Sequence, residues 1–437
     1  MTAVDAGLPQ SKRDPRRALQ ESHAATDPVG FLVLAAQVAG LLFLFHYYHI
    51  ESMQFLEMSA IVFAAFLVHY WLPFRFKEIF WVAVSIAGSF FLLDIKVAAL
   101  VLGAALGIYL ILHCPLALRW RLVLLIAVFA AFLYELVAKP HGIPQSFYGV
   151  FTAIFTLRII LYTYDLAHAK EPPSFLSYLS YFLILPNYYF AYFPVIDFQT
   201  MRITYYRRNI HDIAQQGIHW MVRGAVQLML LKVVFYLDDR FLPDRVTSLP
   251  KLVCALVLTA LFYLRVSGTF HIIVGMLHLF GYDLPETNRR YFLASGFLDY
   301  WRRINIYWKD FMLKVVYFPV YFKFRKQGDL RAQIFGSAAV FTVSWALHSY
   351  GIWISGNFSW TSTIFWSCIG LLVIANVVYE SRHKAPRTAF GWRGRGLLAL
   401  RTAGTFATIV ILWSLNLSPS FSSWLYLMTR WTHGAAQ

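Results

Sequence analysis

Charged residues are scarce in this sequence. Only 14% of its 437 residues are Asp, Glu, Lys or Arg, whereas 59% are hydrophobic, and the mean hydropathy is +0.56. Soluble domains carry about 25% charged residues, so this composition excludes an ordinary soluble domain. It predicts a polytopic membrane protein, folded as one all-α bundle of transmembrane helices.

Acidic residues are rarer than basic ones. The sequence has 22 Asp and Glu against 38 Lys and Arg, which gives a formal net charge of +16. The basic residues fall in short clusters between apolar runs, as they do in cytoplasmic loops. We therefore interpret the positive charge as a signal of topology, and we expect no nucleic-acid partner.

Cysteine and the common catalytic motifs are also missing or few. The three cysteines form no CxxC pair and are expected to be packing residues: Cys114, Cys254 and Cys368. No Walker loop, dinucleotide fingerprint or GxSxG elbow occurs, which argues against a pump, an NAD enzyme and a serine hydrolase. The histidine pairs His46 with His49 and His271 with His278 lack acidic or cysteine partners, so no metal site is expected.

Long apolar runs dominate the rest of the sequence. About 20 residues cross the hydrocarbon core, and roughly ten to twelve crossings are predicted, with partly inserted helices around a central cavity. The runs are 28–48, 52–72, 79–93, 95–113, 122–138, 145–164, 218–237, 250–266, 333–354, 361–379 and 396–416. Gly103 and Gly107 form a GxxxG, a weak packing motif.

The ends of the chain and its basic loops predict an orientation. Residues 1–27 are polar and resemble no cleavable signal peptide, so we expect a disordered cytoplasmic tail before a membrane domain at 28–417 and a C-terminal tail at 418–437. The short-loop charge rule then places four basic clusters in the cytoplasm. They are 75–77, 119–121, 323–331 and 382–401.

Two apolar stretches are unsuited to a simple crossing. Prolines 186 and 194 interrupt 175–196, which we expect to re-enter the membrane, because Arg207 and Arg208 then fall on the cytoplasmic side. The stretch 268–280 is too short to cross and is expected to be a second partly inserted helix.

One ionisable side chain lies inside a lipid-length helix. His348 falls within the apolar run 333–354, and such a residue is costly unless it faces a protein interior or a wet cavity. It is therefore a candidate functional residue. The alternative is a packing histidine that is hydrogen-bonded to a neighbouring helix.

The sequence around His348 resembles a known family. The order FGYDLPE, DYWRRIN, YFP and then an apolar helix with one histidine is similar to the membrane-bound O-acyltransferases, over about 178–354. It is most like the bacterial branch that holds the alginate O-acetyltransferase membrane component and the teichoic acid D-alanylation protein. That branch reads DFWRRWHIS, so Asn305 replaces its first histidine, and LHS at 347–349 replaces WHG.

The resemblance implies an all-α enzyme of the cell inner membrane that moves an acyl group other than an aminoacyl group, most simply acetyl. The donor would be a cytoplasmic thioester of coenzyme A or an acyl carrier protein, with no bound cofactor. The acceptor would be a hydroxyl of an envelope or secreted glycan, or alternatively of a lipid or protein. A separate extracytoplasmic acyltransferase would be a possible partner.

The resemblance also implies roles for individual residues. His348 would be the general base and Asn305 the donor to the carbonyl oxygen. Substrate-binding residues would be Asp299, Trp301, Arg302 and Arg303, since arginine pairs with phosphate groups. The alternatives are a structural amide at Asn305 and interfacial anchors at the arginines. A polytopic transporter of an acyl or glycan intermediate is the rival function.

Overall fold

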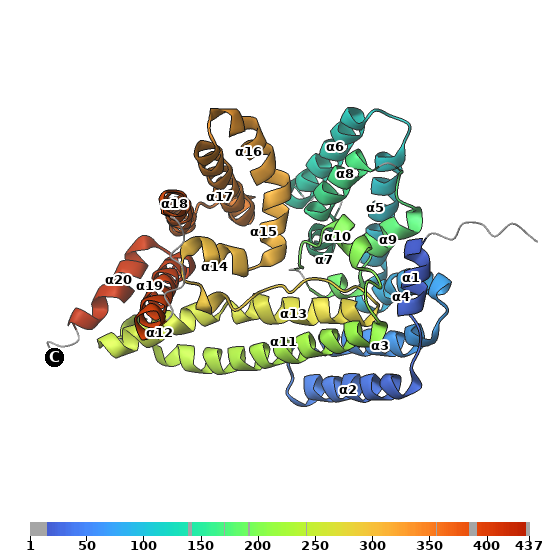
Figure 1. The fold of residues 1–437 in the computed structure, drawn as a ribbon, viewed down its shortest axis with the longest axis horizontal. Helices are drawn as coiled ribbons and strands as arrows, with labels where there is room; N and C mark the ends of the chain where they lie inside the picture. The colour runs from blue at the N-terminus through green and yellow to red at the C-terminus, as the bar shows by residue number, and fades with distance from the viewer. Residues whose placement is uncertain are drawn as a thin grey trace, which may run out of the picture.

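The computed structural model describes residues 15–138, 142–169, 171–190, 193–241, 243–354, 356–383 and 391–433. These residues form helices and loops without a β-strand; the one bridge joins Tyr205 and Tyr282. Ten helical segments among them are long and apolar enough to cross a membrane. The all-α, multi-pass prediction is confirmed (Figure 1).

The N-terminal part is a series of up-and-down helices. They are α1 (Pro15–His23), α2 (Pro28–Tyr47), α3 (Met53–Trp71), α4 (Phe74–Leu92), α5 (Ile95–His113) and α6 (Leu118–Ala138). Asp27 caps α2, since its carboxylate accepts from the backbone N–H groups of Val29 and Gly30. Lys77 of α4 caps the end of α3, because its ammonium donates to the carbonyls of His69 and Tyr70.

Part of the expected tail is folded. Residues 15–23 form α1, and two of its side chains bond to the carbonyls of one loop: Gln20 Nε2 to Tyr205 at 2.8 Å and His23 Nδ1 to Tyr206 at 2.9 Å. The expectation of disorder is wrong for this helix. A short polar helix is not stable alone, and these tertiary contacts stabilise it. Residues 1–14, with Lys12 and Arg13, lie outside the described residues.

The middle of the chain contains short and broken helices. One crossing combines α7 (Gln145–Phe151), the π-helix η1 (Thr152–Thr156) and α8 (Arg158–His168). After it come α9 (Phe175–Phe182), the 3₁₀ turn η2 (Leu185–Tyr188) and α10 (Phe198–Thr204). Neither α9 nor η2 is long enough to cross, so the predicted interruption of 175–196 is present.

Two long antiparallel helices pack against each other in the middle of the chain. They are α11 (Ile210–Asp238) and α13 (Leu264–Leu279), which lie side by side in Figure 1. A Cβ at Gly224 would lie 2.5 Å from the carbonyl oxygen of Gly268, and one at Gly275 would lie 2.5 Å from that of Gly217. The four glycines therefore allow the two backbones to touch.

The stretch 268–280 is not a separate helix. Only a turn at 262–263 separates α12 (Leu249–Leu261) from α13, and together Leu249–Leu279 is long enough to cross. The expectation of a second partly inserted helix is wrong, since Gly268 and Gly275 are packing positions and not helix ends. Two 3₁₀ turns precede α12, η3 (Asp239–Phe241) and η4 (Pro243–Arg245).

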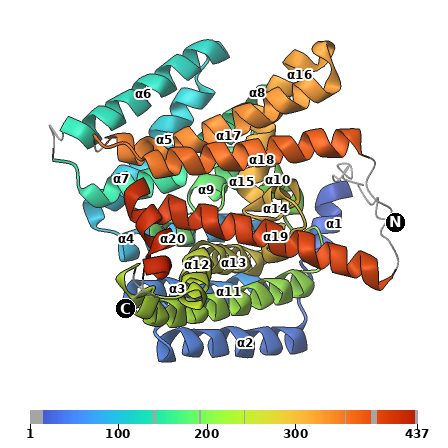
Figure 2. The same ribbon diagram turned by 90° about the vertical axis from the view of Figure 1, so that its left-hand side faces the viewer.

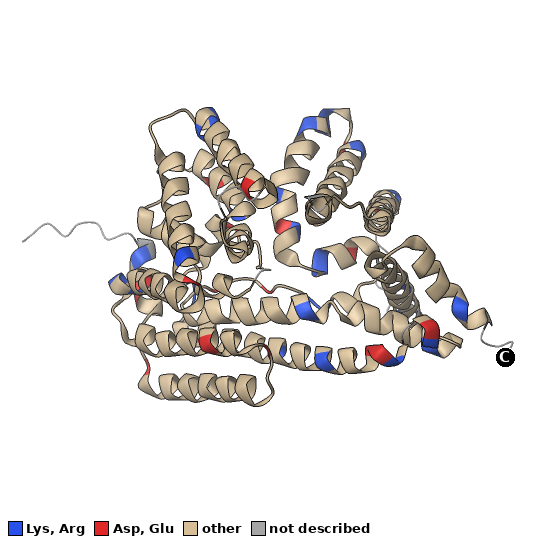
Figure 3. Cartoon of the chain, turned by 180° about the vertical axis from the view of Figure 1, so that it is seen from behind, with Lys and Arg blue, Asp and Glu red and all other residues tan. Residues whose placement is uncertain are grey.

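The C-terminal part surrounds the predicted site. It contains η5 (Tyr291–Leu293), α14 (Phe297–Arg303), α15 (Ile306–Met312), the π-helix η6 (Leu313–Tyr317), α16 (Phe318–Phe324), η7 (Arg325–Gln327), α17 (Asp329–Ile354), α18 (Trp360–Arg382), α19 (Trp392–Leu417) and α20 (Phe421–His433). The C-terminal tail at 418–437 thus carries a helix. Figure 3 shows how few charged residues interrupt the long helices.

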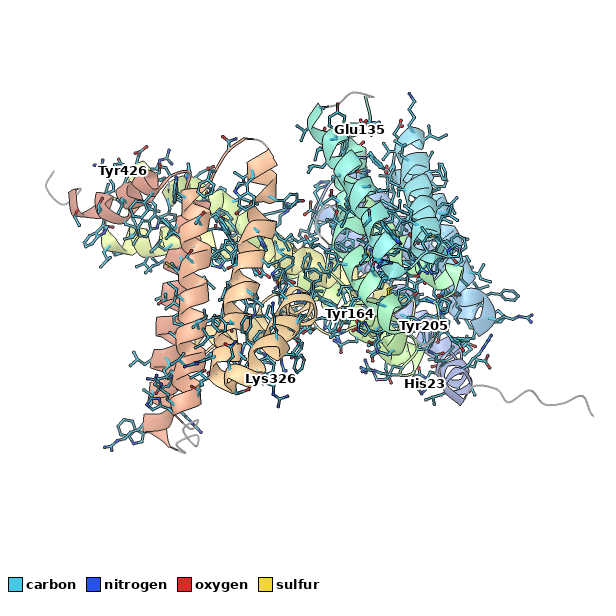
Figure 4. The ribbon with its side chains drawn as sticks, turned by 90° about the horizontal axis from the view of Figure 1, so that it is seen from above. His23, Glu135, Tyr164, Tyr205, Lys326 and Tyr426 are labelled. Carbon is cyan, nitrogen blue, oxygen red and sulfur yellow. The ribbon has the colours of Figure 1, made fainter. Side chains whose placement is uncertain are left out.

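The long helices run in more than one direction. Helices α18 and α19 are seen nearly end-on in Figure 1 and run across the view in Figure 2, whereas α11 runs across both views and is therefore inclined to them. Figure 4 shows His23, Tyr205 and Lys326 at one face and Glu135 and Tyr426 at the other. The predicted inside cluster at 323–331 therefore shares a face with α1. Arg387 and Lys384 of the 382–401 cluster lie outside the described residues.

Candidate functional site

A cavity of about 320 Å³ lies between α14, α15, α17, α18 and α19. Its walls are largely aromatic, formed by Tyr263, Tyr300, Trp301, Trp308, Phe365, Trp366 and Trp413. Its polar residues are Asn305, His348, Ser359, Ser362 and Asn416. The cavity therefore contains both predicted catalytic residues, although they come from different helices.

His348 lines this cavity, and its Nε2 has no hydrogen-bond partner among the residues that the structure describes. Its Nδ1 lies 2.8 Å from the carbonyl oxygen of Ser344, one turn earlier in α17. Because a carbonyl only accepts, Nδ1 carries the hydrogen and Nε2 keeps its lone pair. The ring packs against Trp308 and Trp366, with centroids at 4.9 and 4.6 Å. The geometry leaves Nε2 able to take a proton.

Asn305 presents an amide N–H to the same cavity. Its backbone is left-handed (φ 38°, ψ 65°), a conformation that asparagine adopts more readily than most residues. It is the N-cap of α15, where its Oδ1 accepts from the N–H of Trp308 at 3.3 Å. Its Nδ2 has no hydrogen-bond partner in the described part of the chain and can donate to a ligand.

Asn288 holds this strained turn and was not predicted from the sequence. It is 1% exposed, and its Oδ1 accepts from the backbone N–H of Asn305 at 2.8 Å and from the Tyr263 hydroxyl at 3.1 Å. Next to it, the N–H of Ile306 donates to the carbonyl of Thr287 at 2.9 Å. Asn288 lies in a loop without periodicity, so no sequence signal marked it.

Two indole groups fix the aromatic walls. Trp308 Nε1 donates to the Ser344 hydroxyl at 3.3 Å, which joins α15 to α17. Trp413 Nε1 donates to the Tyr300 hydroxyl at 3.2 Å, which joins α19 to α14. Buried indoles usually find such partners, and here the bonds hold the cavity's sides in place.

The structure divides the predicted substrate-binding residues between two places. Trp301 lines the cavity and packs against Phe341 at 4.8 Å. Arg303 lies elsewhere, where its Nε is 2.7 Å from Asp299 Oδ1 and its side chain lines a second cavity of about 590 Å³ with Arg395 of α19. Arg302 is exposed and lines neither cavity. Asn305, His348 and Trp301 are thus brought together, and Asp299, Arg302 and Arg303 are not.

The cavity is closest to one face of the bundle. His348 comes six residues before the last residue of α17, and Asn416 is the next-to-last residue of α19. The Thr361 hydroxyl, at the start of α18, donates to the carbonyl of Ser418 at 3.2 Å, so these ends meet. The start of α17, near Lys326, lies at the opposite face.

The other motif residues around the site are structural. Asp283 of FGYDLPE accepts hydrogen bonds from Arg207 at 2.8 Å and from Arg208 at 2.5 Å. Burial raises the pKa of Asp283, but the hydrogen bonds from Arg208 and Arg207 outweigh burial and leave the pKa below its usual value. Gly281, at φ 87°, packs under the Tyr206 ring. These contacts anchor the loop that leads to Asn288.

The two histidines of α13 bond to carbonyls of their own helix, and His271 Nδ1 also lies 3.0 Å from Gln227 Oε1 of α11. His271 Nδ1 lies 2.7 Å from the carbonyl of Ser267, and His278 Nδ1 lies 2.7 Å from that of Val274. Within the described ranges, no group of three or more His, Cys, Asp or Glu side chains is arranged to hold a metal ion.

No family model matches the chain, and no curated protein matches it in sequence.

Proposed function

We propose that the protein is a membrane-embedded O-acyltransferase similar to the membrane-bound O-acyltransferase family. The observation that carries the proposal is the cavity shared by His348 and Asn305, in which one nitrogen of each side chain has no hydrogen-bond partner within the described ranges. A free imidazole nitrogen and a free amide N–H are the base and the oxyanion donor that acyl transfer requires.

The proposed reaction uses both groups in sequence. His348 Nε2 takes the proton of the acceptor hydroxyl as its oxygen attacks the thioester carbonyl. Asn305 Nδ2 donates to the carbonyl oxygen as that oxygen becomes negative. When the tetrahedral intermediate collapses, the carbon–sulfur bond breaks, the acyl group stays on the acceptor oxygen, and the proton passes to the thiolate. The apolar walls exclude water that would hydrolyse the donor.

The two cavities suggest how donor and acceptor approach. The same short helix, α14, places Trp301 in the His348 cavity and Arg303 in the second one. Arg303 and Arg395 suit the phosphates of coenzyme A or a phosphopantetheine arm, on the side that the basic loops assign to the cytoplasm. The acceptor, a hydroxyl of an envelope or secreted glycan, would reach His348 from the other face of the inner membrane. A partner extracytoplasmic acyltransferase could complete delivery.

The test is acetyl transfer by the purified protein in lipid nanodiscs, with acetyl-labelled acetyl-coenzyme A as donor and mixed oligosaccharides as acceptors. His348→Gln keeps an amide of similar bulk but cannot accept a proton near neutral pH, so the rate should fall by about 10² or more. His383→Gln is the matched control, because His383 is the exposed C-cap of α18 and makes the same hydrogen bond to a carbonyl one turn back.

Each outcome has a clear meaning. If His348→Gln, matched for folded amount, keeps more than about a tenth of wild-type activity, His348 is no general base. If the wild-type protein binds acetyl-coenzyme A or a glycan without turnover, the transporter alternative is favoured. A drop in thermal stability without loss of turnover would identify His348 as a packing residue.

A further inference from the structure

The mouth of the His348 cavity contains polar groups that the proposed reaction does not use. Asn416 is half-buried near the end of α19, Ser359 is the N-cap of α18, and Ser362 lies in the first turn of that helix. All three line the cavity with His348. Neither Asn416 nor the Ser362 hydroxyl has a side-chain hydrogen-bond partner among the described residues. They form a second polar set, nearer the face that an extracytoplasmic acceptor would reach first.

Among the residues that the structure describes, the cavity has no permanently charged side chain in its lining. No Lys, Arg, Asp or Glu is among the described residues that line it. The arginines of the DYWRRIN motif point elsewhere, Arg303 into the second cavity and Arg302 to the surface. A carboxylate or phosphate on the bound unit would be removed from water without a counter-ion, which is far more costly than the burial of a neutral hydroxyl.

The aromatic walls suit a ring that has one apolar face. Trp366 lies against His348 in a tilted contact with centroids 4.6 Å apart, and Trp413 packs against Phe365 at 5.3 Å. The C–H face of a pyranose ring pairs with such aromatic faces, while its hydroxyls need amide and hydroxyl partners at the rim. Asn416 offers one donor group and one acceptor group. At about 320 Å³ the cavity is at the small end for ligand sites, which favours a single sugar unit over a longer stretch of glycan.

We propose that this mouth is an acceptor subsite for a neutral pyranose unit, positioned by hydrogen bonds to Asn416, and that it discriminates against uronate and phosphate-bearing sugars. The inference rests on the proposed function and names its acceptor class. Asn416 is a positioning residue, since it orients the hydroxyl and takes no part in the proton transfer.

The experiment compares two acceptors that differ only at C6, trigalactose and trigalacturonate. Acetyl transfer from acetyl-coenzyme A is measured for each, and equilibrium dialysis without donor measures binding directly. We expect tighter binding and a lower KM for trigalactose by at least about tenfold, a difference of about 1.4 kcal/mol. Equal binding of the two, preference for trigalacturonate, or no binding of trigalactose overturns the proposal.

Variants separate positioning from folding. Asn416→Ala should raise the KM for trigalactose by about tenfold, the effect of one or two neutral hydrogen bonds, while kcat at saturation changes little. Asn416→Lys adds a cation at the mouth and should shift the preference toward trigalacturonate. Thr408→Ala, an exposed hydroxyl on the same helix, is the control and should change neither value.

The two proposals can fail separately. If the protein transfers no acetyl group but dialysis still shows binding of trigalactose that Asn416→Ala weakens, the subsite is retained and the acyltransferase proposal is lost. If acetyl transfer depends on His348 but Asn416→Ala has a normal KM for trigalactose, the subsite is lost and the reaction is retained.

Discussion

At the scale of single residues, the sequence reveals a functional candidate where its polarity differs from that of its neighbours along the chain. His348 is a lone ionisable group in an apolar helix, and the structure places it in a cavity. Asn416 gives a similar signal, an amide in the run 396–416, which the sequence interpretation overlooked. Asn288 gives none, because its importance comes from a hydrogen bond to Asn305 across a loop. Such contacts depend on tertiary structure and could not be predicted.

The proposed role of the Asn305 amide can be tested by a substitution that adds no backbone strain. Its φ of 38° suits glycine, so Asn305→Gly removes the side chain without a steric penalty, whereas Asn305→Ala adds left-handed strain. If Nδ2 is an oxyanion donor, both variants should lose about 10² to 10³ in kcat for acetyl transfer. Only the alanine variant should show the added strain as a lower Tm. Normal turnover in Asn305→Gly would make the amide structural.

Asp283 should make stability depend on pH at the acidic end. Its folded-state pKa lies below its unfolded value, so its ion pairs stabilise the protein above about pH 4, the unfolded value. That contribution is lost as the pH falls through the folded pKa. Asp283→Asn should cost about 1 to 3 kcal/mol at pH 7, less than a fully buried pair because Arg207 and Arg208 are half exposed.

The measurement for Asp283 is the Tm of wild type and Asp283→Asn from pH 7 down to pH 3. The difference in Tm between the two proteins should be constant near neutrality and should become smaller below about pH 4. Asp310→Asn is the control, since its carboxylate is largely exposed in its pair with Lys309. A gap that stays constant to pH 3 would contradict the assignment.

At the scale of elements, the length of the apolar runs predicted the helices well. The glycines that bring helices together were not predicted. Most apolar runs became helices within a few residues of their expected bounds, because hydrophobic length is a local property. The pairing of α11 with α13 is not local. Its glycines lie seven residues apart in each helix, whereas a Cβ at Gly103 or Gly107, the GxxxG that the sequence offered, would meet nothing within 4 Å.

The close approach of α11 and α13 gives an element-scale prediction. A Cβ at Gly275 would lie 2.5 Å from the Gly217 carbonyl oxygen and 2.6 Å from Met221 Cγ, and backbone atoms cannot rotate away. Gly275→Ala should therefore destabilise the protein by about 1 to 3 kcal/mol, measured as a lower Tm in nanodiscs. Gly107→Ala, with open space around its Cβ, should leave the Tm unchanged or slightly higher. Equal Tm values in the two variants would contradict the packing described here.

At the scale of the whole molecule, the cavities matter through the faces they approach. The His348 cavity lies toward the ends of α17 and α19, and the basic segment with Lys326 lies at the start of α17. The charge rule assigns Lys326 to the cytoplasm, so acceptor and donor would enter from opposite sides. The helical architecture was predictable from the sequence. The division into two cavities was not, because the short helix α14 places Trp301 in one cavity and Arg303 in the other.

Orientation can be tested with single cysteines in a background lacking Cys114, Cys254 and Cys368. Lys326→Cys reports the end of the bundle that contains α1, and Phe358→Cys, 49% exposed in the turn between α17 and α18, reports the other. A membrane-impermeant maleimide added to intact cells should label Phe358→Cys and leave Lys326→Cys unreacted until the membrane is opened, because the short basic loops remain inside. Labelling of Lys326→Cys in intact cells would invert the bundle. The His348 cavity would then lie nearer the cytoplasm, and neither an extracytoplasmic acceptor nor a cytoplasmic thioester at Arg303 would fit the site.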